Sequence, residues 1–137
     1  MIRRRVSDER GSMLPMFGGL IFVSFIMIAL VVELALLGIA YRSTASVADA
    51  SAEAGAAMLS ESHAYASEFV VDPTRARSEA LGAAYSLAGS SVAVEVEATP
   101  SGVCVTVENR YQPTTLLFLG VSGVDVTATS CAEPRIG

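Results

Sequence analysis

The chain has 137 residues, 52% of them hydrophobic, and a formal net charge of −5. It has no Lys, and acidic residues outnumber its Arg by 14 to 9, which excludes a protein that binds nucleic acid through clustered basic side chains. The charge is unevenly distributed, because residues 1–10 carry a net charge of +2 and residues 43–137 carry one of −7.

An apolar run extends from Gly11 to Tyr41 and contains a single charged residue, Glu33. A helix of this length rises about 46 Å, whereas the hydrocarbon core of a bilayer is about 30 Å thick. We predict a cytoplasmic basic leader over residues 1–11 and a transmembrane helix over residues 12–42. The basic leader and the acidic remainder follow the positive-inside rule, which places a single-pass protein in the inner membrane with its C-terminal part outside.

Glu33 is the residue of greatest interest in this run. If the span begins near Met13, Glu33 lies about 30 Å along the helix, at the outer boundary of the bilayer. Its helical neighbours offer no positive partner. Since a charge in hydrocarbon is costly, two interpretations are open: an intramembrane pair with another chain that sets the register of the helices, or a plain glutamate at the end of the span.

Residues 43–71 are rich in alanine and predict an extracytoplasmic helical stalk that continues the transmembrane helix. One row of small residues recurs at four-residue spacing, and such a row lets another helix approach closely. We predict that this helix-packing ridge contacts another subunit; the alternative is that alanine is simply the best helix former. The ridge consists of Ala40, Thr44, Ala48, Ala52 and Ala56.

Residues 72–137 predict a small extracytoplasmic α+β domain. Asp72-Pro73 is typical of a helix start, because Asp caps the first turn and Pro suits the first helical position; the helix is expected to end at Gly89. Apolar and polar residues then alternate in three segments, which predicts a three-stranded antiparallel sheet with its valine face against one or both helices. The segments are residues 91–97, 102–109 and 124–131.

Cys104 and Cys131 are the only cysteines, and both fall on the polar faces of their predicted strands. If the strands are neighbours, the thiols meet, and an extracytoplasmic compartment favours a disulfide between them. Two free thiols or an intermolecular bridge are the alternatives. An intramolecular disulfide would contribute about 3 kcal/mol to the stability of this small domain.

No pattern of residues indicates an enzyme, a cofactor site or a metal site. His63 is the only histidine, on a segment without a converging nucleophile, and the two distant cysteines make no metal motif without histidines. No P-loop, G-x-S-x-G or H-E-x-x-H motif occurs. We therefore expect no catalysis and no small-molecule ligand.

Leu116-Leu117-Phe118-Leu119 is an unusual apolar segment between the second and third predicted strands. It is far too short to span a membrane. Two interpretations remain open for it: filling of the core, or an exposed patch for a partner or for the membrane surface.

Three stretches of the sequence are similar to the TadE/TadG-like proteins, the minor pseudopilins of the bacterial Tad (Flp) tight-adherence pilus system. They are DERGSMLP before the span, ALVVELALLGIAYRSTASVADASAEAGA across its end, and the terminal YQPTTLLFLGVSGVDVTATSCAEPR. The resemblance implies a pilin-like fold, with other pilins or pseudopilins and the pilus assembly platform as partners.

The resemblance also implies cleavage by a prepilin peptidase at the Gly11–Ser12 bond. Pilin-type precursors usually carry Glu five residues after the cut, where this chain has Met16. We expect a non-enzymatic minor pilin or pilus-assembly component that works through helix packing in the membrane. The alternative is a permanently membrane-anchored binding or accessory domain of a secretion system.

Overall fold

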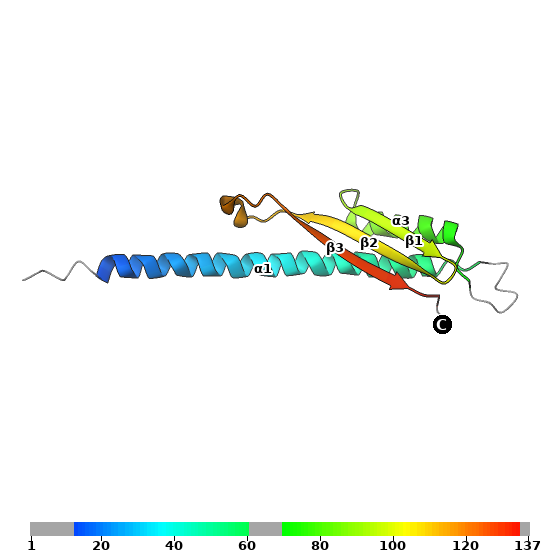
Figure 1. The fold of residues 1–137 in the computed structure, drawn as a ribbon, viewed down its shortest axis with the longest axis horizontal. Coiled ribbons are helices and arrows are strands. Elements are labelled where there is room, and N and C mark those ends of the chain that lie inside the picture. The colour runs from blue at the N-terminus through cyan, green and yellow to red at the C-terminus, as the bar shows by residue number, and fades with distance from the viewer. Residues whose placement is uncertain (1–12, 61–69, 135–137) are drawn as a thin grey trace, which may run out of the picture.

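The computed structural model describes residues 13–60 and 70–134. The fold is α+β: a long N-terminal helix, a short helix and a three-stranded antiparallel sheet (Figure 1). The helices and strands are α1 (Met13–Ala56), α3 (Pro73–Ala88), β1 (Ala93–Thr99), β2 (Gly102–Tyr111), η2 (Leu116–Leu119, a single 3-10 turn) and β3 (Val124–Ala132). The α+β class, with a long helix, a short helix and three antiparallel strands, is as predicted, whereas the 3-10 turn η2 was not predicted.

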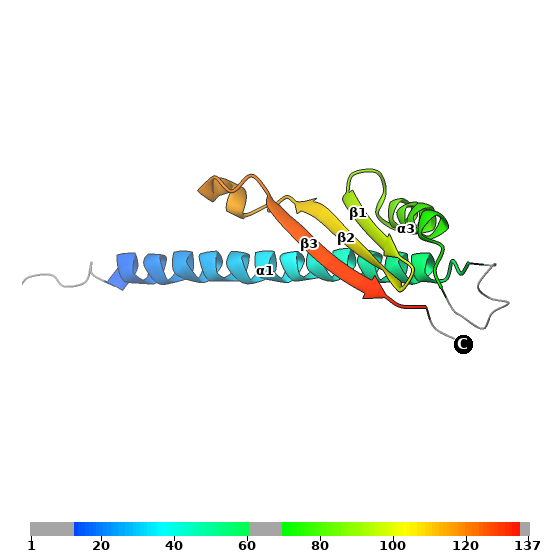
Figure 2. The same cartoon turned by 45° about the vertical axis from the view of Figure 1, so that its right-hand side comes forward.

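Helix α1 is unbroken over 44 residues, and it is long and apolar enough to cross a membrane. Pro15 falls in its first turn, where the missing backbone N–H has no intrahelical acceptor to lose. The helix has two halves. From residue 15 to residue 32 every residue is exposed except the half-buried Ala29. Residues 34–43 are also mostly exposed, and from Thr44 to Ala56 one face of the helix is covered by the sheet and by α3 (Figures 1 and 2).

Helix α3 begins and ends where the sequence predicts. The Asp72 carboxylate accepts hydrogen bonds from the backbone N–H of Thr74 at 3.0 Å and of Arg75 at 3.3 Å, so it satisfies two donors of the first turn. Gly89 ends the helix at φ 76°, a conformation that side chains with a Cβ rarely adopt. Three alanines face inward: Ala76, Ala80 and Ala84.

The sheet has the order β1-β2-β3, and both pairs are antiparallel. Alternation gives it one apolar face, with Val103, Val105 and Val107 of β2 buried at its centre. This face packs against both helices, β1 mainly on α3 and β3 on α1 (Figure 2). The small alanines of the helices allow the valine-rich face to approach closely, which places the core between the two layers.

The structure differs from the predicted stalk over residues 43–71 in two respects. Helix α1 ends at Ala56, and Leu59 then pairs with Val71 in an isolated antiparallel bridge. The last turns of α1 also form part of the core, because Val47, Ala48 and Ala52 are buried under the sheet and α3. Alanine favours a helix whether or not the helix is packed, so composition alone did not reveal this coverage.

Candidate functional site

Counting from residue 15, Glu33 is the first buried residue of α1 and ends its exposed N-terminal part, residues 15–32, which we call the bare half. Only 3% of its surface is exposed, although the residues before it on α1 are almost all exposed. A buried carboxylate requires hydrogen-bond donors, and these come from the far end of the sheet.

Four donors converge on the two carboxylate oxygens of Glu33. The Tyr111 hydroxyl donates to Oε1 at 2.7 Å, and the backbone N–H of Thr114 donates to the same oxygen at 3.1 Å. The backbone N–H of Thr115 donates to Oε2 at 3.0 Å, and the Thr115 hydroxyl donates to it as well. All four donors are uncharged, so the carboxylate is held by oriented dipoles.

These donors are available because of where β2 ends. The strand runs to Tyr111, two residues beyond the predicted end at residue 109, and so it reaches back along α1 to the level of Glu33. Thr114 and Thr115 lie beyond the ladder, where their N–H groups have no strand to bond. Thr115 also precedes the 3-10 turn η2, so its N–H belongs to the free donors at the start of that turn.

The hydrogen bond to Glu33 also changes the acidity of its partner. It raises the pKa of the Tyr111 hydroxyl, because loss of the phenolic proton would break the bond and place a second negative charge beside the carboxylate; burial raises this pKa further. At neutral pH the Tyr111 hydroxyl therefore keeps its proton and donates a hydrogen bond to Glu33.

The structure places the partners of Glu33 in its own chain. This differs from both interpretations offered for the residue, a pair with another chain and a plain helix-end glutamate. The carboxylate accepts four hydrogen bonds within its own chain, because the loop after β2 folds back onto α1. Glu33 thus fixes the sheet to the helix at the level where the bare half begins.

The predicted helix-packing ridge is a packing surface, but the elements that pack against it are the sheet and α3 of the same chain. Thr44, Ala48, Ala52 and Ala56 are buried, and Ala40 is half-buried, beneath the sheet and α3. Contact of this ridge with another subunit is therefore a wrong expectation for the folded chain, because four-residue spacing identifies a close-packed face but not what covers it.

Two of the hydroxyl groups on the second half of α1 belong to buried residues, and both are satisfied within the helix. The Ser51 hydroxyl donates to the Val47 carbonyl at 2.6 Å, and the Thr44 hydroxyl donates to the Ala40 carbonyl at 3.0 Å. Both residues are buried, so the internal hydrogen bonds remove the cost of taking a hydroxyl out of water.

Gly55 lies where α1 passes close to both α3 and β2. A Cβ at this position would lie 3.0 Å from the Ala76 carbonyl oxygen, 3.1 Å from the Ala80 Cβ and 3.1 Å from a Val103 methyl group. The glycine is required here by space rather than by an unusual backbone angle.

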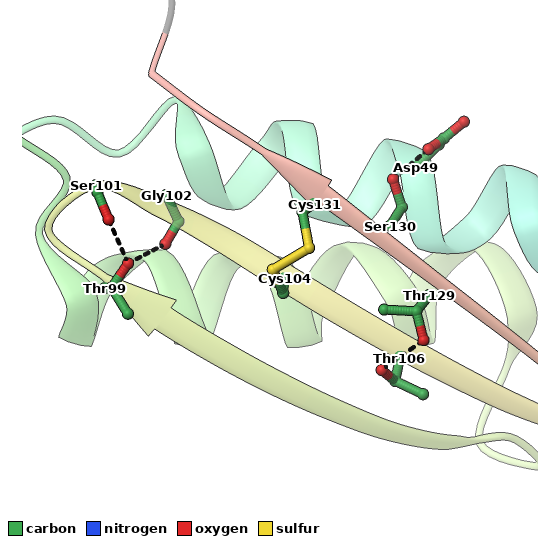
Figure 3. Close-up of a disulfide and its surroundings, with 9 residues drawn as sticks. All are labelled: Asp49, Thr99, Ser101, Gly102, Cys104, Thr106, Thr129, Ser130 and Cys131. Carbon is green, nitrogen blue, oxygen red and sulfur yellow. Dashed lines mark hydrogen bonds between the residues drawn. A yellow bond between two sulfur atoms is a disulfide. The ribbon is translucent and has the colours of Figure 1, made fainter.

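Cys104 and Cys131 are directly opposite each other on β2 and β3 and form a disulfide, with their sulfur atoms 2.06 Å apart (Figure 3). The bond lies on the outer face of the sheet, away from the helices. On the inner face nearby, the Ser130 hydroxyl donates to the Asp49 carboxylate and ties β3 to α1 (Figure 3). The disulfide closes the end of the sheet opposite to the Glu33 loop.

The remaining predicted residues lie elsewhere. Gly11, Ser12 and His63 fall outside the described residues. Within residues 13–60 and 70–134, no group of three or more His, Cys, Asp or Glu is placed to hold a metal ion.

The loop residues Tyr111, Thr114 and Thr115 were missed as partners of Glu33. Their only sequence signal is indirect: a lone carboxylate in an apolar helix must find donors, and threonines that follow a strand have free N–H groups. A separation of about 80 residues hides the pairing from any local pattern.

Comparison of this chain with protein-family models, with curated proteins and with solved structures finds no match.

Proposed function

We propose that this chain is a minor pilin, or pseudopilin, that acts in assembly of a bacterial Tad (Flp) tight-adherence pilus. One observation carries the proposal: a single helix is bare and apolar over its first half and packed into a small α+β domain over its second half. In such a subunit the bare half of the helix lies in the bilayer before assembly. It can then pack into a bundle of like helices without unfolding of the domain.

The proposal includes an orientation, with the N-terminus in the cytoplasm and the domain outside the inner membrane. The basic residues 1–10 and the acidic remainder support it through the positive-inside rule. The disulfide also favours an oxidising compartment for the domain.

Because the ridge is buried, we place the proposed assembly surface nearer the N-terminus of α1. The ridge face of residues 40–56 is covered by the chain's own sheet and α3, so we assign the contacts with other pilins to the bare half, residues 15–32. The proposed work remains helix packing in the membrane, without a catalysed reaction.

Site-specific photo-crosslinking in the native host tests the proposal. A photoreactive amino acid at Phe25, which is 69% exposed on the bare half, should crosslink to other pilins or pseudopilins or to the assembly platform. The same group at Tyr85, on the exposed side of α3, is the matched control. Crosslinks from Phe25 to lipid alone, together with normal piliation after deletion of the gene, would contradict a pilus role.

The state of the N-terminus distinguishes a processed pilin from a permanent anchor. N-terminal sequencing of the membrane-extracted protein should give Ser12 as the first residue if a prepilin peptidase acts at Gly11–Ser12. A chain that begins at Met1 would instead favour a permanently anchored accessory domain, since residues 1–11 would remain in the cytoplasm.

A further inference from the structure

The tip of the connection between β2 and β3 (residues 111–120) lies beside α1 at the level of Glu33, to which it is bonded. From Met13 to Val32 the helix has 20 residues before Glu33, a rise of about 30 Å, which matches the hydrocarbon thickness of a bilayer. A span that begins at Met13 would therefore end at the height of the tip. Both views of the fold show η2 beyond the end of the sheet, on the side of the bare half of α1 (Figures 1 and 2).

The tip carries apolar side chains that the domain does not cover. Leu117 is 62% exposed and Leu116 is half-buried. Among the described residues outside α1, the other exposed large apolar side chains are Leu87 at 59% and Tyr85 at 45%, and both lie on α3 away from this level. Core filling, the first of the two interpretations given for this segment, is therefore wrong for Leu117.

Several backbone groups of the tip are paired within the chain. The N–H groups of Thr114 and Thr115 are bonded to Glu33. At the other end, Gly120 donates to the Leu117 carbonyl at 3.0 Å and Val121 donates to the Leu116 carbonyl at 3.2 Å. This pairing lowers the cost of moving these backbone groups from water toward an apolar medium.

We propose that residues 111–120, the lipid-binding tip, insert Leu116 and Leu117 into the outer interface of the bilayer, and that Glu33 holds them at that depth. The occupant is lipid rather than a protein because the tip continues the apolar surface of the bare half of α1. Side chains typical of an interface lie at this level and beyond it: Tyr111 in the tip, and the exposed Tyr41 and Arg42 about 12 to 14 Å further along α1. The proposal requires α1 to span a membrane but does not depend on a role in a pilus.

Intrinsic fluorescence tests this directly, because the chain has no Trp. The full-length Leu117→Trp variant is reconstituted into vesicles of phosphatidylcholine and phosphatidylglycerol, with and without bromine on the upper acyl chain. Leu87→Trp, at an equally exposed position on α3, is the matched control, and Phe25→Trp in the bare half marks full burial in lipid.

We expect the Leu117→Trp variant to emit at a shorter wavelength than Leu87→Trp and to lose emission in brominated vesicles, while Leu87→Trp does not. Emission and quenching equal to those of Leu87→Trp would overturn the proposal. So would shielding that develops only when other proteins of the same membrane are added, because the occupant would then be a protein.

The role of Glu33 is tested in the same assay with Glu33→Gln added to Leu117→Trp. Loss of the hydrogen bonds to Thr115 should release the tip and reduce quenching by the brominated lipid, while quenching of Phe25→Trp with Glu33→Gln stays unchanged. Undiminished quenching of the double variant would show that Glu33 does not hold the tip.

Discussion

The Tyr111 hydroxyl donates a 2.7 Å hydrogen bond to Oε1 of Glu33 and so joins the end of β2 to the middle of α1 across 78 positions of sequence. The sheet is therefore attached to the helix at two levels: through the valine and alanine core over the last turns of α1, and through Glu33 near the start of the bare half. Two attachments separated along the axis of α1 oppose tilting of the domain relative to the helix. The position of the helix along its axis therefore also sets the position of the domain.

Glu33→Gln is expected to loosen the loop after β2 without unfolding the domain. A glutamine side chain has one acceptor oxygen, and its NH₂ group would face donors that the second carboxylate oxygen now accepts. Hydrogen exchange at the backbone amides of Thr114 and Thr115, measured on the full chain in detergent micelles, should therefore accelerate. Tyr111→Phe, which removes one donor and leaves both backbone bonds, should change these rates less. Equal rates in Glu33→Gln and the unsubstituted protein would contradict the assignment.

Tyr111 should titrate at a higher pH than an ordinary tyrosine. Because Glu33 raises the pKa of the folded-state hydroxyl, the associated stability is fully present below the usual tyrosine pKa of about 10 and is lost as the pH rises through the folded-state value. The tyrosinate absorbance of the protein minus that of Tyr111→Phe gives the titration of this group. A midpoint at or below the usual value would contradict the bond to Glu33.

Gly55 and Gly82 should respond to the same substitution with opposite signs. Gly55→Ala forces a methyl group against the Ala76 carbonyl and the Ala80 Cβ and should destabilise the domain by about 1–3 kcal/mol. Gly82→Ala fills open space inside α3 and should stabilise it by about 1 kcal/mol through helix propensity. Thermal unfolding of the full chain in micelles measures both. A stable Gly55→Ala variant would show that α1 and α3 are not packed this closely.

Removal of the disulfide should weaken the domain without altering its fold. The bond closes a segment of 27 positions, so the Cys104→Ser, Cys131→Ser double variant should lose about 3 kcal/mol of unfolding free energy. Denaturant unfolding with and without a reducing agent measures this. The reductant should shift the unsubstituted protein to the curve of the double variant and leave the double variant unchanged. A reductant-insensitive unsubstituted protein would indicate that the thiols are not bonded.

Much of this fold is predictable from local patterns. Asp72-Pro73 and Gly89 identify both ends of α3, because capping chemistry is local. Alternation identifies the three strands, and the polar-face positions of Cys104 and Cys131 made their pairing a natural expectation once the strands were neighbours.

The elements that pack against α1 were not predictable from local patterns. The spacing of Ala48 and Ala52 indicates that something packs closely, but α3 and the sheet reach this face only after the chain turns back. The apolar surroundings of Glu33 indicate that its carboxylate needs a partner. The donors lie in and next to a loop that has no charged residue, so the sequence did not identify them. Both failures concern long-range contacts, which no periodicity in a single helix encodes.

The two parts of α1 should tolerate different kinds of substitution. Before Glu33, where the side chains are bare, large apolar residues of almost any shape should be accepted and a single charge should not. From Thr44 onward, volume is the constraint on the covered face: small hydroxyl residues such as Thr44 and Ser51 are tolerated there because they bond their own helix, while one added methylene meets a filled space. A saturation library of α1 should therefore change from intolerance of polarity before Glu33 to intolerance of size on this face from Thr44 onward.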